Sequence, residues 1–398
     1  MSRIFIIALL LLLGLEPSIA GTNINNTLDT VTLDEATVFS VDVNQDELSI
    51  QNDNSEKTLM EKLHDIRAIE VEDINKRNFL FSEILTKNYP ESSMMDSLHL
   101  WAGYNGDMTF AFPEHSNSVV GNYEFNTICA GLDGKLKDDN ADFRIMLANQ
   151  PLSSRTIARG MFADMYVATN KLPNTRVQIG HFRPGFGIEG QQSTFTLPFL
   201  QRSQISRNYG TVRKMGGKVQ GDYRLFDYNI GMYSSSTYFK TFFPGAEFDG
   251  WLNFKPLGFT DGKYGHLTIG TGMQAGERDS HYCLTGAYLR YDYKRFFANI
   301  ETAQGSGANG AKLETDKHTA GFYTTMGYRL TPKLQALVRY DEFNNNKHVS
   351  NNTQREYTAG LNYFIKGNGL KIMLNYVFCQ NQSTKDSHKI MLGTQILL

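Results

Sequence analysis

The chain of 398 residues contains one stretch in which cationic side chains gather with almost no carboxylate beside them. Between residues 183 and 214 the cations are Arg183, Arg202, Arg207, Arg213 and Lys214, and the single acid is Glu189. A guanidinium donates two parallel hydrogen bonds to two oxygens of one oxyanion, whereas an ammonium acts as a mobile point charge. The chemistry that this stretch offers is therefore the binding of small anions.

A predicted strand leads into this cationic stretch. Val177 and Ile179 alternate with Arg176 and Gln178, which is the period of a half-polar strand. Roughly thirty residues without alternation follow, and a loop of that length is usually either functional or disordered. Its Phe and Tyr content argues against disorder. We therefore expect the segment 183–212 to fold into a pore and to supply the charge that selects what passes.

The rest of the C-terminal part has the pattern of a barrel wall. Residues 320–330 and 334–341 place apolar and polar side chains on opposite faces, and short turns alternate with long polar connections. Segments of roughly ten residues with this pattern are typical of a transmembrane β-barrel with short periplasmic turns and longer outer loops. A soluble β-sandwich also alternates, but it seldom separates short turns and long loops so regularly.

The same alternation of short turns and long connections, followed toward the N-terminus, predicts further strands. They lie near 97–112, 120–135, 141–150, 159–170, 173–183, 213–224, 225–235, 247–255, 265–275, 281–292 and 294–304. Three further strands are predicted at 357–365, 370–380 and 390–398, which brings the total to sixteen. An even number agrees with both barrel ends lying on the periplasmic side. We therefore predict an all-β fold, a sixteen-stranded antiparallel transmembrane β-barrel over residues 96–398 with the segment 183–212 as its third outer loop. A barrel of that size encloses an aqueous lumen.

Alternation also predicts which wall residues face the lumen. Arg176, Lys214 and Lys218 point inward, together with Arg144, Arg290, Arg295, Arg329 and Arg339 and with the acids Asp164, Asp222, Asp249, Glu301 and Asp341. The inward carboxylates would repel anions and so weaken the anion binding that the inward cations provide. Each inward cation of a strand could instead pair with a neighbouring acid in a wall salt bridge, which leaves two interpretations open for these residues.

The N-terminal residues precede the predicted barrel in three parts. Residues 1–20 combine Arg3, an apolar run and a small-residue end, as in a secretory signal peptide, and the run is short for the alternative, an uncleaved anchor. Residues 21–54 are polar and acidic and predict a disordered segment. Residues 55–95 predict an amphipathic helix that ends at Asn88–Pro90 and a linker, with a coiled coil as the alternative.

Charge divides the chain, since acids are in excess over residues 22–95 and bases over residues 96–398. A basic domain can attract nucleic acid, acidic lipid or small anions, and the export signal disfavours nucleic acid. The glycines of residues 185–190 match a dinucleotide-binding pattern, but no βαβ unit surrounds them. The nine histidines and three cysteines show no metal spacing. We therefore predict no enzyme activity, no cofactor and no metal.

Residues 160–235 contain MFADMYVATNKLPNTRVQIGHFRPGFGIEG, FLQRS and GGKVQGDYRLFDYNIGMYSSS. Over this part the chain resembles the phosphate-selective porins of Gram-negative outer membranes, more loosely over the rest of the barrel. The resemblance implies a homotrimer in outer-membrane lipid, a third loop folded inward, and passive uptake of phosphate or similar small anions. It makes Arg183, Arg202 and Arg207 the constriction candidates, to which we add Arg213, Lys214, Lys218 and Arg176. A structural or adhesive barrel without selective transport is the alternative.

Overall fold

The computed structural model describes residues 77–114, 119–137, 141–149, 161–235, 243–307, 317–382 and 385–398. The predicted signal peptide, the acidic segment 21–54 and the first part of the helix predicted within residues 55–95 lie outside these ranges. None of the helices within them is both long and apolar enough to cross a membrane.

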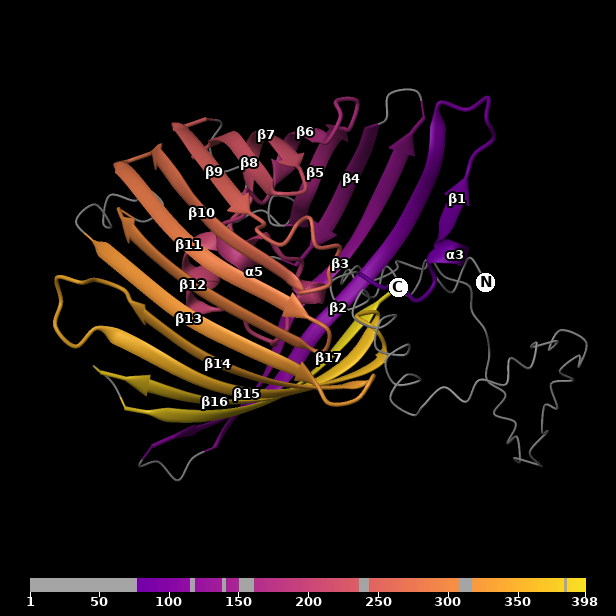
Figure 1. Ribbon diagram of the computed structural model, residues 1–398. Coiled ribbons are helices and arrows are strands. Elements are labelled where there is room, and N and C mark those ends of the chain that lie inside the picture. Colours follow the sequence, from indigo (N-terminus) through magenta and orange to yellow (C-terminus); the bar gives the residue numbers. More distant parts are fainter. Residues whose placement is uncertain are drawn as a thin grey trace, which may run out of the picture. The chain divides into compact units, whose positions relative to one another are not determined.

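Antiparallel strands dominate the described residues (Figure 1). They are β2 (Met95–Pro113), β3 (Val120–Leu136), β4 (Ala141–Ala148), β5 (Phe162–Thr169), β6 (Thr175–Phe182), β7 (Lys214–Asp222), β8 (Phe226–Ser234), β9 (Ala246–Phe254), β10 (His266–Glu277), β11 (His281–Tyr293), β12 (Phe296–Ser306), β13 (His318–Arg329), β14 (Leu334–Asn344), β15 (Thr353–Lys366), β16 (Leu370–Asn381) and β17 (Ser387–Leu397).

Each of these strands pairs with the strands that precede and follow it in the sequence, and β17 pairs with β2 to close the ring. The closing register runs from Ser387 opposite Pro113 to Leu397 opposite Gly103. The prediction of a sixteen-stranded antiparallel barrel is therefore confirmed. The strand ends agree with the predicted ones within a few residues, as for β7, which was expected at 213–224.

The wall alternates between an apolar outer face and a polar inner face. On β14, Val338 is 55% exposed on the outer face, whereas its neighbours Arg339 and Leu337 are buried inside. An aromatic row crosses the outer face of five neighbouring strands and consists of Phe322, Tyr340, Tyr357, Phe378 and His388. Such rows are typical of the interface between a bilayer and water.

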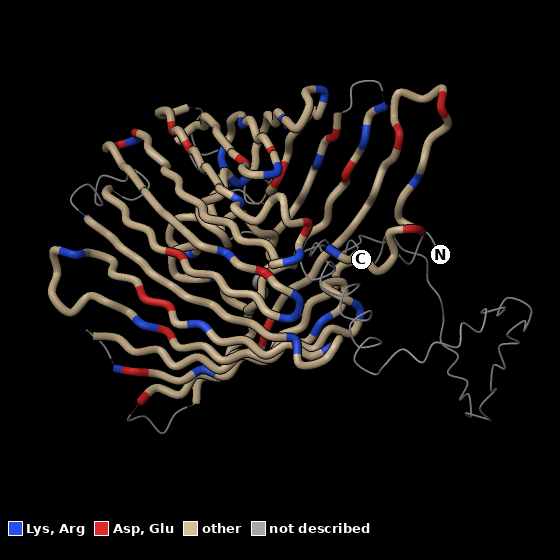
Figure 2. The backbone as a smooth tube through the Cα atoms, in the orientation of Figure 1, with Lys and Arg blue, Asp and Glu red and all other residues tan. Residues whose placement is uncertain are grey.

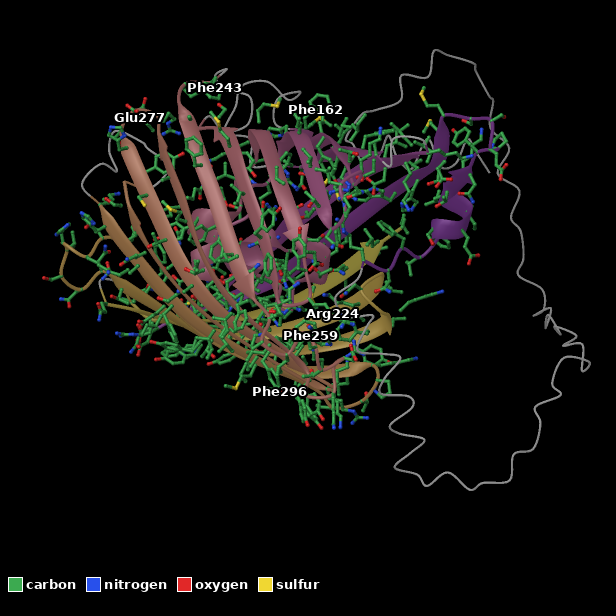
Figure 3. The ribbon with its side chains drawn as sticks, turned by 45° about the horizontal axis from the view of Figure 1, so that its top comes forward. Phe162, Arg224, Phe243, Phe259, Glu277 and Phe296 are labelled. Carbon is green, nitrogen blue, oxygen red and sulfur yellow. The ribbon has the colours of Figure 1, made fainter. Side chains whose placement is uncertain are left out.

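The two ends of the barrel differ in their connections. The turns after β7, β11 and β15 span only residues 223–225, 294–295 and 367–369, and we call this end the turn end. The connection 183–213 starts from the opposite end, which we call the loop end. Figure 3 shows Phe243 and Glu277 at the loop end and Arg224, Phe259 and Phe296 at the turn end. In bacterial outer-membrane barrels the turn end faces the periplasm.

The residues before the barrel differ from the prediction. Only Ser82–Leu85 (α3) is helical between residues 77 and 94, and Thr86–Asn88 (β1) forms a short strand on β2. The amphipathic helix predicted to run to Asn88–Pro90 is therefore not seen over its described part. The reason is that the edge of β2 beyond the end of β17 offers unpaired backbone groups, and an extended segment satisfies them.

Candidate functional site

The connection between β6 and β7, residues 183–213, crosses the interior of the barrel and is called the third loop below. It contains three short helical turns, α5 (Gly187–Gln191), η2 (Thr194–Thr196) and η3 (Ser206–Gly210) (Figure 1). The two arms of the loop cross at Gly190 and Gly210, where a Cβ on Gly210 would lie 2.8 Å from the Cα of Gly190. Because neither glycine carries a Cβ, the two arms can approach this closely.

Carboxylates of the opposite wall accept hydrogen bonds from the loop backbone. Glu301 on β12 accepts from the Ile188 N–H at 2.9 Å, and Asp341 on β14 accepts from the Gln204 N–H at 2.7 Å. Buried N–H groups without helix or sheet partners need such acceptors. We expected these inward acids to weaken a row of anion sites, but Glu301 and Asp341 instead hold the third loop in place.

The only acid of the third loop is itself used as an anchor. Glu189 is 1% exposed, and its carboxylate pairs with Arg339 of β14 at 3.4 Å and accepts from the Ser203 N–H at 2.5 Å. Its backbone carbonyl accepts from the guanidinium of Arg202. Since Glu189 faces the β14 wall, its charge is directed away from the other side of the barrel.

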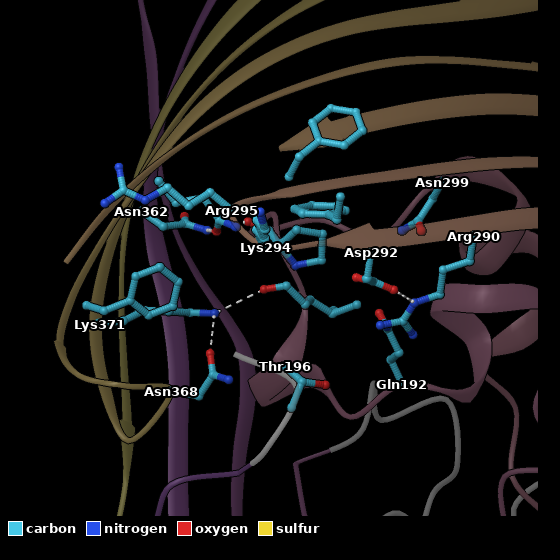
Figure 4. A pocket seen from close by; sticks show the side chains of 16 residues that line it. Gln192, Thr196, Arg290, Asp292, Lys294, Arg295, Asn299, Asn362, Asn368 and Lys371 are labelled. Atoms are coloured by element: carbon cyan, nitrogen blue, oxygen red, sulfur yellow. Dashed lines mark hydrogen bonds and ion pairs between the residues drawn. The ribbon is translucent and has the colours of Figure 1, made fainter. Parts of the chain in front are cut away.

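Loop carbonyl groups are held from the β15–β17 side. The ammonium of Lys371 donates to the Leu197 carbonyl at 3.0 Å and to Asn368 at 3.3 Å, as Figure 4 shows. Asn362 donates to the Pro198 carbonyl at 2.8 Å. Lys371 is 1% exposed and lies in a small pocket at the turn end that Arg290, Lys294 and Arg295 also line.

Apolar side chains fix the loop to the same part of the wall. Phe186 and Tyr209 are buried in one cluster with Trp251, Leu284 and Tyr323. The Phe186 ring meets Trp251 edge to face with a centroid separation of 5.1 Å. Buried aromatic rings contribute large contact areas and a preferred geometry. The third loop therefore packs mainly against the wall from β9 round to β17, and its Phe195 ring also joins a buried cluster with residues of β2 to β5.

A cavity of about 470 Å³ lies between the third loop and residues of β3 to β8, and we call it the pore cavity. Its charged lining residues are Arg77, Arg144, Arg183, Arg202, Arg213, Lys218 and Asp164. Six described cations thus face one described carboxylate, although cationic and acidic positions are interleaved over the strands as a whole (Figure 2). The one carboxylate, Asp164, accepts a hydrogen bond from Arg213 at 2.7 Å.

The pore cavity continues toward the turn end. A second cavity of about 1270 Å³ lies there, lined by residues of β2 to β5 and of the segment before β2. Arg144 and Tyr166 line both cavities, so the two spaces meet at these side chains. The two cavities therefore adjoin at the wall formed by β4 and β5.

The structure brings four of the seven predicted site residues together. Arg183, Arg202, Arg213 and Lys218 all line the pore cavity. Lys218 stands with its ammonium nitrogen 5.2 Å from the centre of the Phe182 ring and makes no hydrogen bond or ion pair with another described residue. Among these four cations, Lys218 is therefore the one whose charge is not used in a polar contact with a described residue.

The other three predicted site residues do not line the pore cavity. Arg207 pairs with Glu356 of β15 at 2.6 Å, Arg176 pairs with Asp142 at 2.5 Å, and Lys214 is buried in a pair with Glu247 of β9. The wall salt bridge is thus the arrangement found for Arg176 and Lys214. We leave these three residues out of the proposed selectivity site.

Burial affects the pKa of one cation of the third loop, Arg202. Desolvation lowers the pKa of Arg202 to about 10, and the nearby Glu189 opposes this shift. A base with a pKa near 10 remains protonated at neutral pH. Arg202 therefore adds a positive charge to the pore cavity while its hydrogen bonds to the Glu189 and Gln192 carbonyls hold the loop.

One pore residue was missed in the sequence. Arg77 lines the pore cavity but lies in the segment that we predicted to be a helix outside the barrel. Neither its spacing nor its neighbours in the sequence mark it, because its position depends on contacts with the C-terminal strands.

The closed barrel with an inward third loop and a cavity beside it is the architecture of outer-membrane channels. Solved structures of outer-membrane channels share this fold. The DcaP channel of Acinetobacter baumannii aligns with a TM-score of 0.54 at 10% identity, covering 78% of this chain and 100% of that chain. OprB of Pseudomonas putida gives 0.56 at 11% identity, covering 76% and 94%. OmpT of Vibrio cholerae in its trimer form gives 0.52 at 9% identity, covering 76% and 99%.

A sequence family agrees with the fold. The model of the family described as phosphate-selective porin O and P matches residues 263–397, and the resemblance is confirmed there. This region runs from the end of the β9–β10 connection to the end of β17, so the match falls C-terminal to residues 160–235, where we found the resemblance densest. A comparison with curated protein sequences gives no match. The protein is accordingly placed in the outer membrane.

Proposed function

We propose that this porin conducts small anions, with inorganic phosphate as the representative oxyanion, by passive diffusion through the pore cavity. The observation that carries the proposal is the lining of six described cations against the one described carboxylate, Asp164. In a narrow space between low-dielectric walls, an excess of one charge raises the concentration of the opposite ion and excludes like ions.

Several features of the lining support an oxyanion. Arg144, Arg183, Arg202 and Arg213 present guanidinium groups, whose planar donors match the spacing of phosphate or carboxylate oxygens. Many of their donors are already used, as in the two bonds of 2.6 Å from Arg144 to Asp133. Such partly satisfied cations give several moderate sites, and moderate binding favours conduction because an ion must leave as well as enter.

The proposal includes assembly as a homotrimer in outer-membrane lipid. The apolar outer face of the strands supports contact with lipid, and the family resemblance supports the trimer. Chemical cross-linking in detergent checks this point, and a protein that cross-links no further than the monomer would contradict it.

The function is tested by the reversal potential of the purified protein in a planar bilayer under a KCl gradient. We expect a reversal potential of the sign for chloride, and a chloride current that decreases when phosphate is added at low concentration. A potential of the sign for potassium would refute anion selectivity. Complete absence of conductance would favour the alternative, a structural or adhesive barrel without selective transport.

A further inference from the structure

The segment that precedes the barrel is bound to its turn end at three points. The Leu80 N–H donates to the Leu397 carbonyl at 2.9 Å, and the Asn78 side-chain oxygen accepts from the Asn368 N–H at 3.0 Å. Farther along, β1 pairs with the start of β2. Residues 77–88 therefore occupy a defined place beside the last strand and the β15–β16 turn.

Two side chains at the beginning of this segment point into the barrel. The Phe79 ring packs edge to face on His99 of β2 at a centroid separation of 4.6 Å, and it lies 5.9 Å from the ring of Trp101. Trp101 is only 1% exposed and belongs to the inner face. The central guanidinium carbon of Arg77 lies 5.9 Å from the same Trp101 ring and lines the pore cavity.

Trp101 also holds a second arginine. The guanidinium carbon of Arg144 lies 5.6 Å from the Trp101 ring, so one indole contacts a cation of the wall and a cation of the preceding segment. Contacts of this kind favour Trp over the other aromatic residues. The ring thereby fixes both guanidinium groups at the point where the pore cavity meets the turn-end cavity.

The two arginines differ in how their charge is balanced. Arg144 donates twice to the carboxylate of Asp133, at 2.6 Å for each bond. Arg77 forms no ion pair or hydrogen bond with any other residue that the structure describes. Burial and the nearby Arg144 lower the pKa of Arg77, but a guanidinium stays protonated under physiological conditions. Its charge thus acts on the contents of the pore cavity.

We propose that Arg77 is a charge-selectivity residue of the pore, supplied by the segment that precedes the barrel. The barrel wall and third loop alone would then form an incomplete pore, since the charge facing Arg144 across Trp101 comes from outside β2–β17. The ligand class is a small oxyanion, for which inorganic phosphate serves as the probe. This inference rests on the proposed anion selectivity and assigns part of it to Arg77.

A purely structural role for Arg77 is the competing explanation, because the same contact with Trp101 could only fix the segment. The charge distinguishes the two explanations. Arg77→Lys retains the positive charge and Arg77→Gln removes it. Lys87→Gln is a matched control, since Lys87 belongs to the same segment but lies against the Tyr89 ring and does not line the pore cavity.

The test measures reversal potentials of the full chain and these variants in planar bilayers at about 0.1 M KCl, where screening is still moderate. We expect Arg77→Gln to lower the anion-to-cation permeability ratio about fourfold, from the Coulomb energy of one charge at pore distance. It should also weaken the block of chloride current by phosphate. Arg77→Lys and Lys87→Gln should stay within twofold of the wild type.

The outcomes separate this inference from the proposed function. An unchanged ratio in Arg77→Gln, together with a lowered ratio in Lys218→Gln, would overturn the role of Arg77 and keep the anion pore. A wild-type reversal potential of the sign for potassium would overturn the anion pore and this inference with it. Loss of folded, conducting protein in both Arg77→Gln and Arg77→Lys would show a structural role and would also overturn the inference.

Discussion

Replacing Lys218 by Gln removes one positive charge from the pore without leaving a partner unpaired. Lys218 is on β7, lines the pore cavity, and has the Phe182 ring as its close neighbour, with no hydrogen bond or ion pair to another described residue. Gln is polar and of comparable reach. The substitution therefore isolates the effect of charge from effects on packing or on loop anchoring.

The expected change in the anion-to-cation permeability ratio follows from the dimensions of the pore cavity. In a space of about 470 Å³, a central ion lies about 6 Å from a lining charge, and the interaction in water is about 0.7 kcal/mol. Screening at about 0.1 M salt reduces this energy to about 0.4 kcal/mol. The charge stabilises an anion and destabilises a cation by the same amount, so its loss changes the permeability ratio by about 0.8 kcal/mol, or about fourfold.

The assay is the reversal potential in a planar bilayer under a KCl gradient, measured at low and at high mean salt. At about 0.1 M we expect the fourfold decrease in anion preference, and at about 1 M less than twofold, because the Debye length falls to about 3 Å. Lys333→Gln is the matched control. Lys333 lies in the turn between β13 and β14 and does not line the pore cavity, so its loss should leave the ratio unchanged.

Two results would refute this reasoning. Equal reversal potentials for the wild type and Lys218→Gln would mean that ions do not pass beside β7. An equal shift in Lys333→Gln would mean that the net charge of the protein, rather than the field within the pore cavity, sets the preference.

Three further predictions concern the third loop and its charge. Lys371→Met removes the hydrogen bond to the Leu197 carbonyl, so single-channel recordings should show fluctuation between current levels where the wild type shows one; a steady single level would contradict this. Glu189→Gln removes the ion pair at 3.4 Å from buried Arg339, which keeps the more distant carboxylate of Asp341 at 3.8 Å. The loss is at most about 3 kcal/mol, so thermal unfolding in detergent followed by circular dichroism should occur at a lower temperature than for the wild type. An unchanged midpoint would show that Glu189 is not an anchor. Anion preference should stay constant between about pH 5 and 7, where guanidinium and ammonium groups are charged, and should decrease at alkaline pH as the lining bases lose their protons, Arg202 among them with its pKa lowered to about 10. A decrease between pH 5 and 7, seen as a shift in reversal potential, would assign the selectivity to a different kind of group.

The wall of the barrel could be predicted because its signal is local. Each strand crosses the membrane with one face toward lipid and one toward water, so apolar and polar residues alternate within a few neighbouring positions. Val338 and Arg339 show this directly, since they are adjacent in the sequence and lie on opposite faces. The long connection between β6 and β7 was equally visible, because alternation stops at Phe182 and resumes near Lys214.

The barrel, its number of strands and the cationic content of the third loop therefore follow from local sequence patterns. Which cations face the pore depends on contacts between distant strands. Arg207 and Lys214 are cations like Lys218, but Glu356 and Glu247 come from distant strands and pair with them. Arg77 enters the pore because the Leu397 carbonyl binds its segment. The physical reason is that pairing depends on the register between strands far apart in the sequence, and that register exists only once the barrel has closed.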